Sequence, residues 1–303
     1  MHPAPSVIVF TTLSGFGFGL LAFLALGLPA LTGWTALFAY GAGVAFAVAG
    51  LVASTFHLGR PERALLAFTQ WRTSWLSREA WAAVLALVAV GLHALGPVFL
   101  GQRFAVLGAA GAALCVATLV ATGMIYAQIR AVPRWHRTET PALFVALGLA
   151  GGALGAGQAG AAALLLALAG AVQIRVWQVG DGAFAEAGTD LGTATGLGAR
   201  GVVRAFEPPH TGRNYLLDEM VHVVGRRHAA KLRRLGFGAA VAAPFAVALA
   251  VALTPGGGVW ALWAAAALHL GGVLALRWLF FAEAEHVVGL YYGHRTGAAP
   301  ASG

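Results

Sequence analysis

The chain of 303 residues has few charged residues and a single cysteine. Only 10% of its residues are charged, against roughly 25% in ordinary globular proteins, which argues against a soluble fold. The mean hydropathy of +0.78 excludes intrinsic disorder, because disorder needs low hydrophobicity and high charge density. The lone Cys115 excludes a disulfide framework, a cluster-binding set of thiolates and covalently attached c-type haem.

Long apolar runs make up most of the sequence. A bilayer core of about 30 Å takes roughly 20 apolar residues as a helix, and a helix satisfies its own backbone hydrogen bonds in lipid. We expect eight spans, near residues 6–28, 34–56, 77–100, 104–128, 141–156, 160–177, 235–253 and 259–281. The fifth is the weakest, since glycines leave it short. The predicted fold is an all-α integral membrane protein, a bundle of eight transmembrane helices in one domain, residues 1–303.

The formal net charge of +8 bears first on membrane orientation. With eight spans, both termini lie on one side together with the loops after spans two, four and six. Nearly all basic residues fall on that side, whereas the opposite side has Arg103. The positive-inside rule then predicts cytoplasmic termini in a bacterial inner membrane. The same basic surface also suits an acidic protein partner, while no nucleic-acid partner is expected.

The largest hydrophilic segment is a predicted cytoplasmic loop over residues 178–234. Its first half is rich in glycine. Its second half, residues 213–234, combines apolar side chains at residues 215–224 with basic side chains at residues 226–234, which is typical of an amphipathic helix at the membrane interface. This helix would bind anionic lipid or dock another protein.

Ionisable residues at membrane depth carry the functional signal, because they are costly in lipid. His57 ends the second span and Glu79 opens the third, so both lie at the cytoplasmic face. A quinone head group needs hydrogen-bonding partners and proton exchange near an interface, which an imidazole beside a carboxylate can supply. We therefore predict a quinone site with His57 and Glu79 as its catalytic residues. The full predicted set of quinone-binding residues is His57, Arg60, Trp75, Arg78, Glu79 and Tyr126.

Each of these residues also has a simpler interpretation. His57 could be an ordinary interfacial histidine. Ser77 could be the N-cap of the third span, so that Arg78 and Glu79 serve only the start of the helix and its dipole.

Other ionisable residues lie in the second half of the chain or deep in the spans. Arg175 and Arg277 are near span ends, where we expect their side chains to snorkel to the interface. His93 and His269 are interpreted as packing histidines, with a pair of b-type haem ligands as the alternative. Residues at the end of the last span either close a polar cavity or end the helix in water: Glu283, Glu285 and His286. No metal site is predicted on this chain.

Two motifs resemble a known family. The sequence His-Leu-Gly-x-Pro-x-Arg-Ala at residues 57–64, followed by Ser-x-Leu-Ser-x-Glu at residues 74–79, is similar to dimethyl sulfoxide reductase anchor subunits. Residues 126–135 and 283–293 also resemble that family. The resemblance implies that an iron–sulfur subunit and a molybdopterin catalytic subunit bind one membrane face. It also implies electron exchange with quinone without haem, at a site that includes His57 and Glu79.

The predicted orientation indicates which members of this family the chain resembles more. In members that serve periplasmic reductases the motif histidine is periplasmic, whereas the basic residues here place His57 on the cytoplasmic face. The chain therefore looks more like the membrane subunit of cytoplasmic sulfite-oxidising molybdoenzymes, in which sulfite gives electrons to ubiquinone or menaquinone. One alternative is an anchor that oxidises menaquinol for a dimethyl sulfoxide-type reductase. An eight-span transporter is the alternative of another class, because the glycine-interrupted fifth span could be a broken helix.

Overall fold

The computed structural model describes residues 2–57, 60–207, 210–212, 214–220, 228–254, 256 and 258–292, without the side chains at positions 57, 61, 62 and 218. Every regular element in these ranges is a helix. The predicted all-α class is therefore confirmed.

Within the described ranges, seven helices are long and apolar enough to cross a membrane. They are α1 (Pro5–Ala25), α2 (Gly33–Ala53) with the turn η1 (Ser54–His57), α3 (Trp75–Leu95) with the π-turn η3 (Gly96–Leu100), α4 (Ala105–Ala127), α6 (Ala159–Glu186), the continuous run of α10 (Ala229–Phe237), η5 (Gly238–Ala242) and α11 (Ala243–Leu253), and α12 (Val259–Ala282). The predicted fifth span corresponds to α5 (Glu139–Gly155), an apolar helix of 17 residues.

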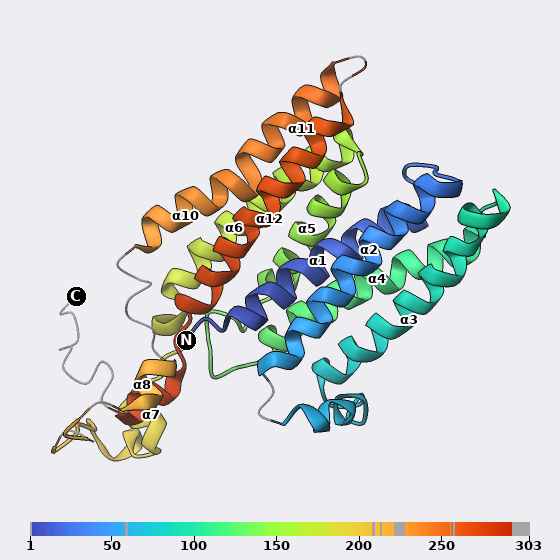
Figure 1. Cartoon of the computed structure of the whole chain (residues 1–303). Coiled ribbons are helices and arrows are strands. Elements are labelled where there is room, and N and C mark those ends of the chain that lie inside the picture. The colour runs from blue at the N-terminus through green and yellow to red at the C-terminus, as the bar shows by residue number, and fades with distance from the viewer. Residues whose placement is uncertain are drawn as a thin grey trace.

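Successive long helices run in opposite directions through one bundle (Figure 1). Helices α1 and α5 lie in its middle, with α2, α3 and α4 on one side and α6, α11 and α12 on the other. Consequently α2, α4, α6 and α12 all end where α1, α3, α5 and α10 begin. We call this the charged end, because the described loops there carry most of the basic residues, whereas Arg103 lies at the opposite end.

The described part of the hydrophilic segment after α6 contains short helices. Helix α6 continues past residue 177 to Glu186, and α10 begins at Ala229, so the segment is shorter than residues 178–234. It contains α7 (Leu191–Thr195), η4 (Gly198–Arg200) and α8 (Tyr215–Met220). Only part of the predicted amphipathic helix can be compared, because residues 213 and 221–227 lie outside the described ranges. The remaining short helices are η2 (Pro61–Phe68) and η6 (Val287–Tyr292).

Helices α1 and α5 pack with their backbones in contact. A Cβ atom added to Gly19 would lie 1.9 Å from the carbonyl oxygen of Gly148, and one added to Gly152 would lie 2.1 Å from the carbonyl carbon of Gly19. Glycine permits this approach because it has no side chain. Around this contact α5 packs against α1, α4, α6 and α12, so α5 is enclosed by protein along its length.

The outer helices instead expose large apolar side chains. Exposed examples are Trp34, Phe38, Val106, Leu164 and Trp260. Such a surface is costly in water and suits lipid tails, as the sequence predicted.

The glycine contact can be tested with two substitutions in one helix. Gly19→Ala is expected to lower the free energy of unfolding by about 2 kcal/mol, because the added methyl group overlaps the α5 backbone. Gly15→Ala is the matched control, since nothing lies within 4 Å of its Cβ position and alanine favours a helix over glycine by roughly 1 kcal/mol. Thermal unfolding in detergent measures both. Equal melting temperatures for the two variants would contradict the packing described here.

Candidate functional site

Glu79 lies buried between α3 and α4 near the charged end. Its side chain is in the first turns of α3 and is only 4% exposed. Because α3 and α4 are antiparallel, this turn meets the last turns of α4, and the Thr122 hydroxyl donates a 2.5 Å hydrogen bond to Glu79 Oε1. Tyr126, one turn further along α4, is also buried and lies within electrostatic reach of the Glu79 carboxyl. The structure therefore brings together two of the predicted site residues.

Trp75 and Arg78 form a separate contact at the surface of the same helix start. The Arg78 guanidinium carbon lies 4.5 Å from the centroid of the Trp75 ring. The same side chain donates hydrogen bonds to the carbonyl oxygens of Trp71 and Arg72, at 3.0 and 2.7 Å. Arg78 thus ties the chain segment before α3 to the first turn of that helix. The predicted N-cap at Ser77 is wrong, because α3 already begins at Trp75.

The remaining predicted site residues lie in the chain between α2 and α3. Arg60 is exposed just before η2. His57 is the last residue of η1, and its side chain lies outside the described part of the structure. The proximity of His57 to Glu79 therefore stays a prediction.

Tyr126 is held by an aromatic cluster that the sequence did not predict. Its ring centroid lies 5.4 to 5.5 Å from those of Trp135, Phe144, Phe280 and Phe281. Trp135 Nε1 also donates a 3.0 Å hydrogen bond to the Phe280 carbonyl oxygen. The cluster joins α4, the segment after it, α5 and α12, and so fixes the position of Tyr126 relative to α12.

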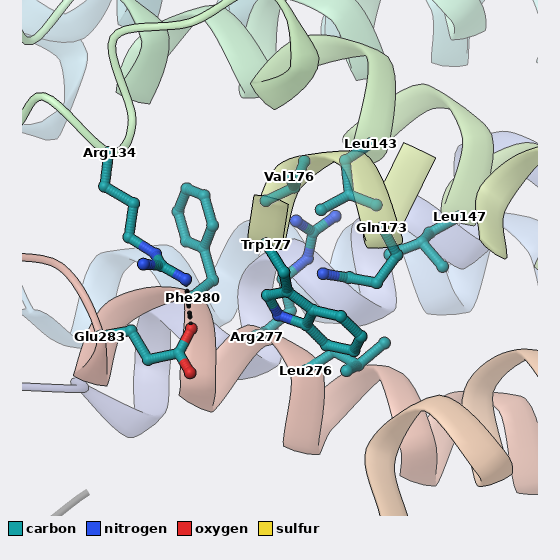
Figure 2. A pocket seen from close by; sticks show the side chains of 10 residues that line it. All are labelled: Arg134, Leu143, Leu147, Gln173, Val176, Trp177, Leu276, Arg277, Phe280 and Glu283. Atoms are coloured by element: carbon teal, nitrogen blue, oxygen red, sulfur yellow. Dashed lines mark hydrogen bonds and ion pairs between the residues drawn. The ribbon is translucent and has the colours of Figure 1, made fainter. Parts of the chain in front are cut away.

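The prediction that Arg277 snorkels to the membrane interface is wrong. Arg277 is only 2% exposed. Its guanidinium carbon lies 3.4 Å from the centroid of the Phe144 ring, and Nε and Nη1 have no hydrogen-bond partner among the described residues. Figure 2 shows Arg277 and Gln173 pointing into a small void among apolar side chains. Arg175, in contrast, is mostly exposed and lies 3.5 Å from Glu139.

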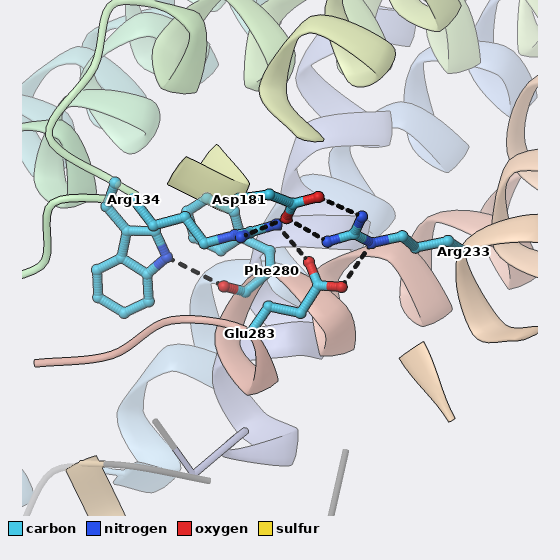
Figure 3. A network of polar contacts seen from close by, with 6 residues as sticks. Arg134, Asp181, Arg233, Phe280 and Glu283 are labelled. Carbon is cyan, nitrogen blue, oxygen red and sulfur yellow. Dashed lines mark hydrogen bonds and ion pairs between the residues drawn. The ribbon is translucent and has the colours of Figure 1, made fainter. Parts of the chain in front are cut away.

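Four charged side chains form a network at the charged end (Figure 3). Glu283 accepts hydrogen bonds from Arg134 Nη2 at 2.7 Å and from Arg233 Nε at 2.6 Å. Asp181 accepts from the same two guanidinium groups at 2.6 to 2.9 Å. The network joins the segment after α4 to the ends of α6, α10 and α12. Sequence reasoning missed it because its four members are far apart along the chain.

A hollow of about 680 Å³ opens beside this network. Its polar lining consists of Arg134, Asp181, Arg233, Arg234, Glu283 and Glu285. The sequence left open whether Glu283 and Glu285 close a polar cavity or end a helix in water. In the structure both side chains are nearly buried and line this open hollow. His286 Nδ1 accepts a 3.0 Å hydrogen bond from the Val288 amide, and burial lowers the pKa of the His286 imidazole below its ordinary value.

His93 and His269 pack against different helices. His93 Nδ1 lies 3.1 Å from the Phe104 carbonyl oxygen, whereas both His269 nitrogens face carbonyl oxygens, of Ala240 at 2.5 Å and of Leu147 at 3.2 Å. They do not form the facing pair that a b-type haem needs. In the described part of the chain, no group of three or more His, Cys, Asp or Glu side chains could hold a metal ion.

Comparison with known proteins identifies the family of this chain. The sequence profile described as DMSO reductase anchor subunit (DmsC) matches residues 1–171. The chain belongs to this family. It is also similar to a sulfite dehydrogenase subunit of Allochromatium vinosum, with 34% identity over 96% of this chain and 99% of the relative. No solved structure gives a significant match.

Family membership and the apolar helices together identify a multi-pass membrane protein. The family match covers residues 1–171, and this region contains every predicted quinone-binding residue. It does not include Asp181, Arg233, Arg277 or Glu283, so the charged network and the buried arginine extend beyond the matched region.

The network makes a specific prediction for stability. Glu283→Ala removes a nearly buried carboxylate and leaves Arg134 and Arg233 with only Asp181 as their shared acid, so we expect about 2 kcal/mol of destabilisation. Glu186→Ala is the control, because Glu186 pairs with Arg137 at an exposed position and should cost about 0.5 kcal/mol or less. Thermal unfolding of the two variants measures the difference. A Glu283→Ala protein as stable as Glu186→Ala would show that the network does not hold the helix ends together.

Proposed function

We propose that the chain is the membrane anchor and quinone-reactive subunit of a molybdopterin and iron–sulfur oxidoreductase complex. The buried Glu79 carboxyl near the charged end is the single observation that carries the quinone assignment. Family membership supports the anchor role, and similarity to the sulfite dehydrogenase subunit of Allochromatium vinosum supports sulfite as the electron donor.

The proposed topology has eight spans, with α5 as the fifth. At about 1.5 Å per residue, its 17 residues reach the lower limit of a membrane span. The enclosing helices support this placement, because a short helix surrounded by protein needs no apolar length of its own to match the lipid. The basic residues at the charged end then favour a cytoplasmic location for that end and for both termini, in the bacterial inner membrane.

In this proposal the partner subunits bind the charged end. An iron–sulfur subunit docks on the basic loops after α2, α4 and α6 and carries electrons from a molybdopterin subunit, where sulfite is oxidised. Glu79 lies in the first turns of α3, which begins at the charged end, and this favours electron entry at the same end. Membrane lipids surround the outer apolar surface.

Quinone reduction at this site requires two electrons and two protons per quinone. An iron–sulfur cluster on the partner subunit would supply the electrons. His57 and Glu79 pass protons from water at the charged end to the two quinone oxygens. Thr122 holds the Glu79 carboxyl in place, and Tyr126, one turn further along α4, is fixed by its contact with Phe144. Arg60, Trp75 and Arg78 line the approach from the surface. Because electrons and protons enter from one side, the reaction is electroneutral.

One substitution can distinguish a role of Glu79 in proton transfer from a role in assembly of the complex. Glu79→Gln keeps the shape of the side chain but cannot exchange a proton, so sulfite-dependent quinone reduction should fall about 100-fold or more. Sulfite-dependent reduction of ferricyanide by the partner subunits should stay unchanged. His57→Ala should behave in the same way.

Glu139→Gln is the matched control, because Glu139 lies at the same end of the bundle but pairs with Arg175. Its quinone reduction should match that of the unmodified complex. Normal quinone kinetics in Glu79→Gln would remove Glu79 from the mechanism.

The family match also favours a second candidate, an anchor that oxidises menaquinol for a dimethyl sulfoxide-type reductase. The two differ in the membrane face of the charged end. We expect a Thr254→Cys protein, in a Cys115→Ala background, to react with a membrane-impermeant maleimide in right-side-out spheroplasts and not in inside-out vesicles, because Thr254 is exposed at the end opposite the charged end. Labelling only in inside-out vesicles would instead place the charged end in the periplasm and favour the reductase anchor.

A further inference from the structure

Three spaces follow one another from the charged end into the bundle. The hollow of about 680 Å³ shares Arg134 and Glu283 with a void of about 10 Å³ that is also lined by Gln173 and Arg277. That void shares Leu147 and Arg277 with a second void of about 10 Å³. The shared lining residues make the three spaces neighbours, and Arg277 stands between the two inner ones.

The inner voids are bordered by polar atoms that lack partners. Arg277 Nε and Nη1 face the interior without a hydrogen-bond acceptor in the described part of the chain, and so does the Thr12 hydroxyl, which lines the second void. A buried polar group without a partner costs a few kcal/mol, and a buried unpaired charge costs more. Such groups in native proteins are usually satisfied, often by an internal water.

Each inner void has the size that one water molecule needs. A water requires at least about 10 Å³ of accessible space and two to four polar partners. In the first void Arg277 and the Gln173 amide can bind it, and in the second void Arg277, Thr12 and the Thr11 hydroxyl lie on the lining. Most of the remaining lining residues, such as Leu147 and Phe280, are apolar. Among the polar ones, Arg134 and Glu283 bind each other, and both His269 nitrogens face backbone carbonyl oxygens.

The Phe144 ring does not replace this solvation. Its face lies against the Arg277 guanidinium and stabilises the charge in part. The N–H groups of Arg277 point outward in the plane of the guanidinium, however, and the ring lies above or below that plane. Nε and Nη1 therefore still need acceptor atoms in the plane. Carboxylates of the described network are engaged elsewhere, since Glu283 and Asp181 each bind Arg134 and Arg233.

We propose that Arg277 is a hydrated internal site, at which two bound waters, supplied from the hollow at the charged end, solvate the guanidinium inside the bundle. The waters accept hydrogen bonds from Arg277, and the inner one also bonds the Thr12 hydroxyl. This hydrated site keeps a positive charge at membrane depth, close to Tyr126, because the Phe144 ring contacts both residues. If the proposed quinone site is correct, this charge favours the negative charge that develops there during reduction.

Radiolytic footprinting tests the site without any turnover. Hydroxyl radicals formed by X-ray pulses at bound waters oxidise the side chains next to them. Leu147 lines both voids, whereas Leu154, in the same helix and equally buried, lines none of the three spaces. In the purified complex we expect Leu147 to be oxidised at least about tenfold faster than Leu154, as internal water at the voids requires.

A variant links the signal to the guanidinium. Arg277→Met keeps much of the side-chain volume and removes the hydrogen-bond donors, so the Leu147 rate should fall to that of Leu154. Equal rates for the two leucines in the unmodified protein would overturn the proposal, as would a Leu147 rate that Arg277→Met leaves unchanged. Because no step of this experiment involves quinone, its outcome is independent of the quinone assignment.

Discussion

The backbone contact between α1 and α5 is the constraint on which the rest of this bundle depends. Lipid offers no hydrophobic force that would drive helices together, so close packing of small residues has to hold them. Gly19, Gly148 and Gly152 allow the two central helices to touch. Once α1 and α5 are in contact, α4 and α12 can pack against both of them from opposite sides. This arrangement places Tyr126 of α4 beside the aromatic residues of α12.

The polar groups inside the bundle follow from that arrangement. Glu79 reaches Thr122 because α3 packs against α4, and Arg277 reaches Phe144 because α12 packs against α5. Tyr126 lies one turn from Thr122 on α4, and its ring contacts Phe144, which also contacts Arg277. At the charged end, Glu283 and Asp181 tie the ends of the second group of helices together through Arg134 and Arg233. The interior polarity is thus concentrated toward one end of the bundle.

Sequence patterns predicted what depends on local composition. Apolar runs located the long helices, and the uneven distribution of arginine predicted the gathering of basic loops at one end. Glu79 was singled out because a carboxylate beside a span is costly, and the structure buries it. The burial of Arg277 was not predicted, since its distance from the end of an apolar segment does not reveal whether its side chain turns to the interface or to the interior. The aromatic cluster around Tyr126 and the Glu283 network depend on contacts between distant segments, which no local pattern reports. The place of His57 relative to Glu79 remains a prediction.

The central claim is that this chain passes electrons from a metal-bearing partner to quinone. The most direct measurement is made on the complex purified gently through a tag on this chain, with metal analysis, an oxidised-minus-reduced spectrum and an assay of sulfite-dependent reduction of a short-chain quinone. We expect molybdenum and iron, no b-type haem band, and quinone reduction by sulfite. A metal-free single polypeptide, with loss of partner proteins excluded by crosslinking in the membrane before purification, would contradict the central claim.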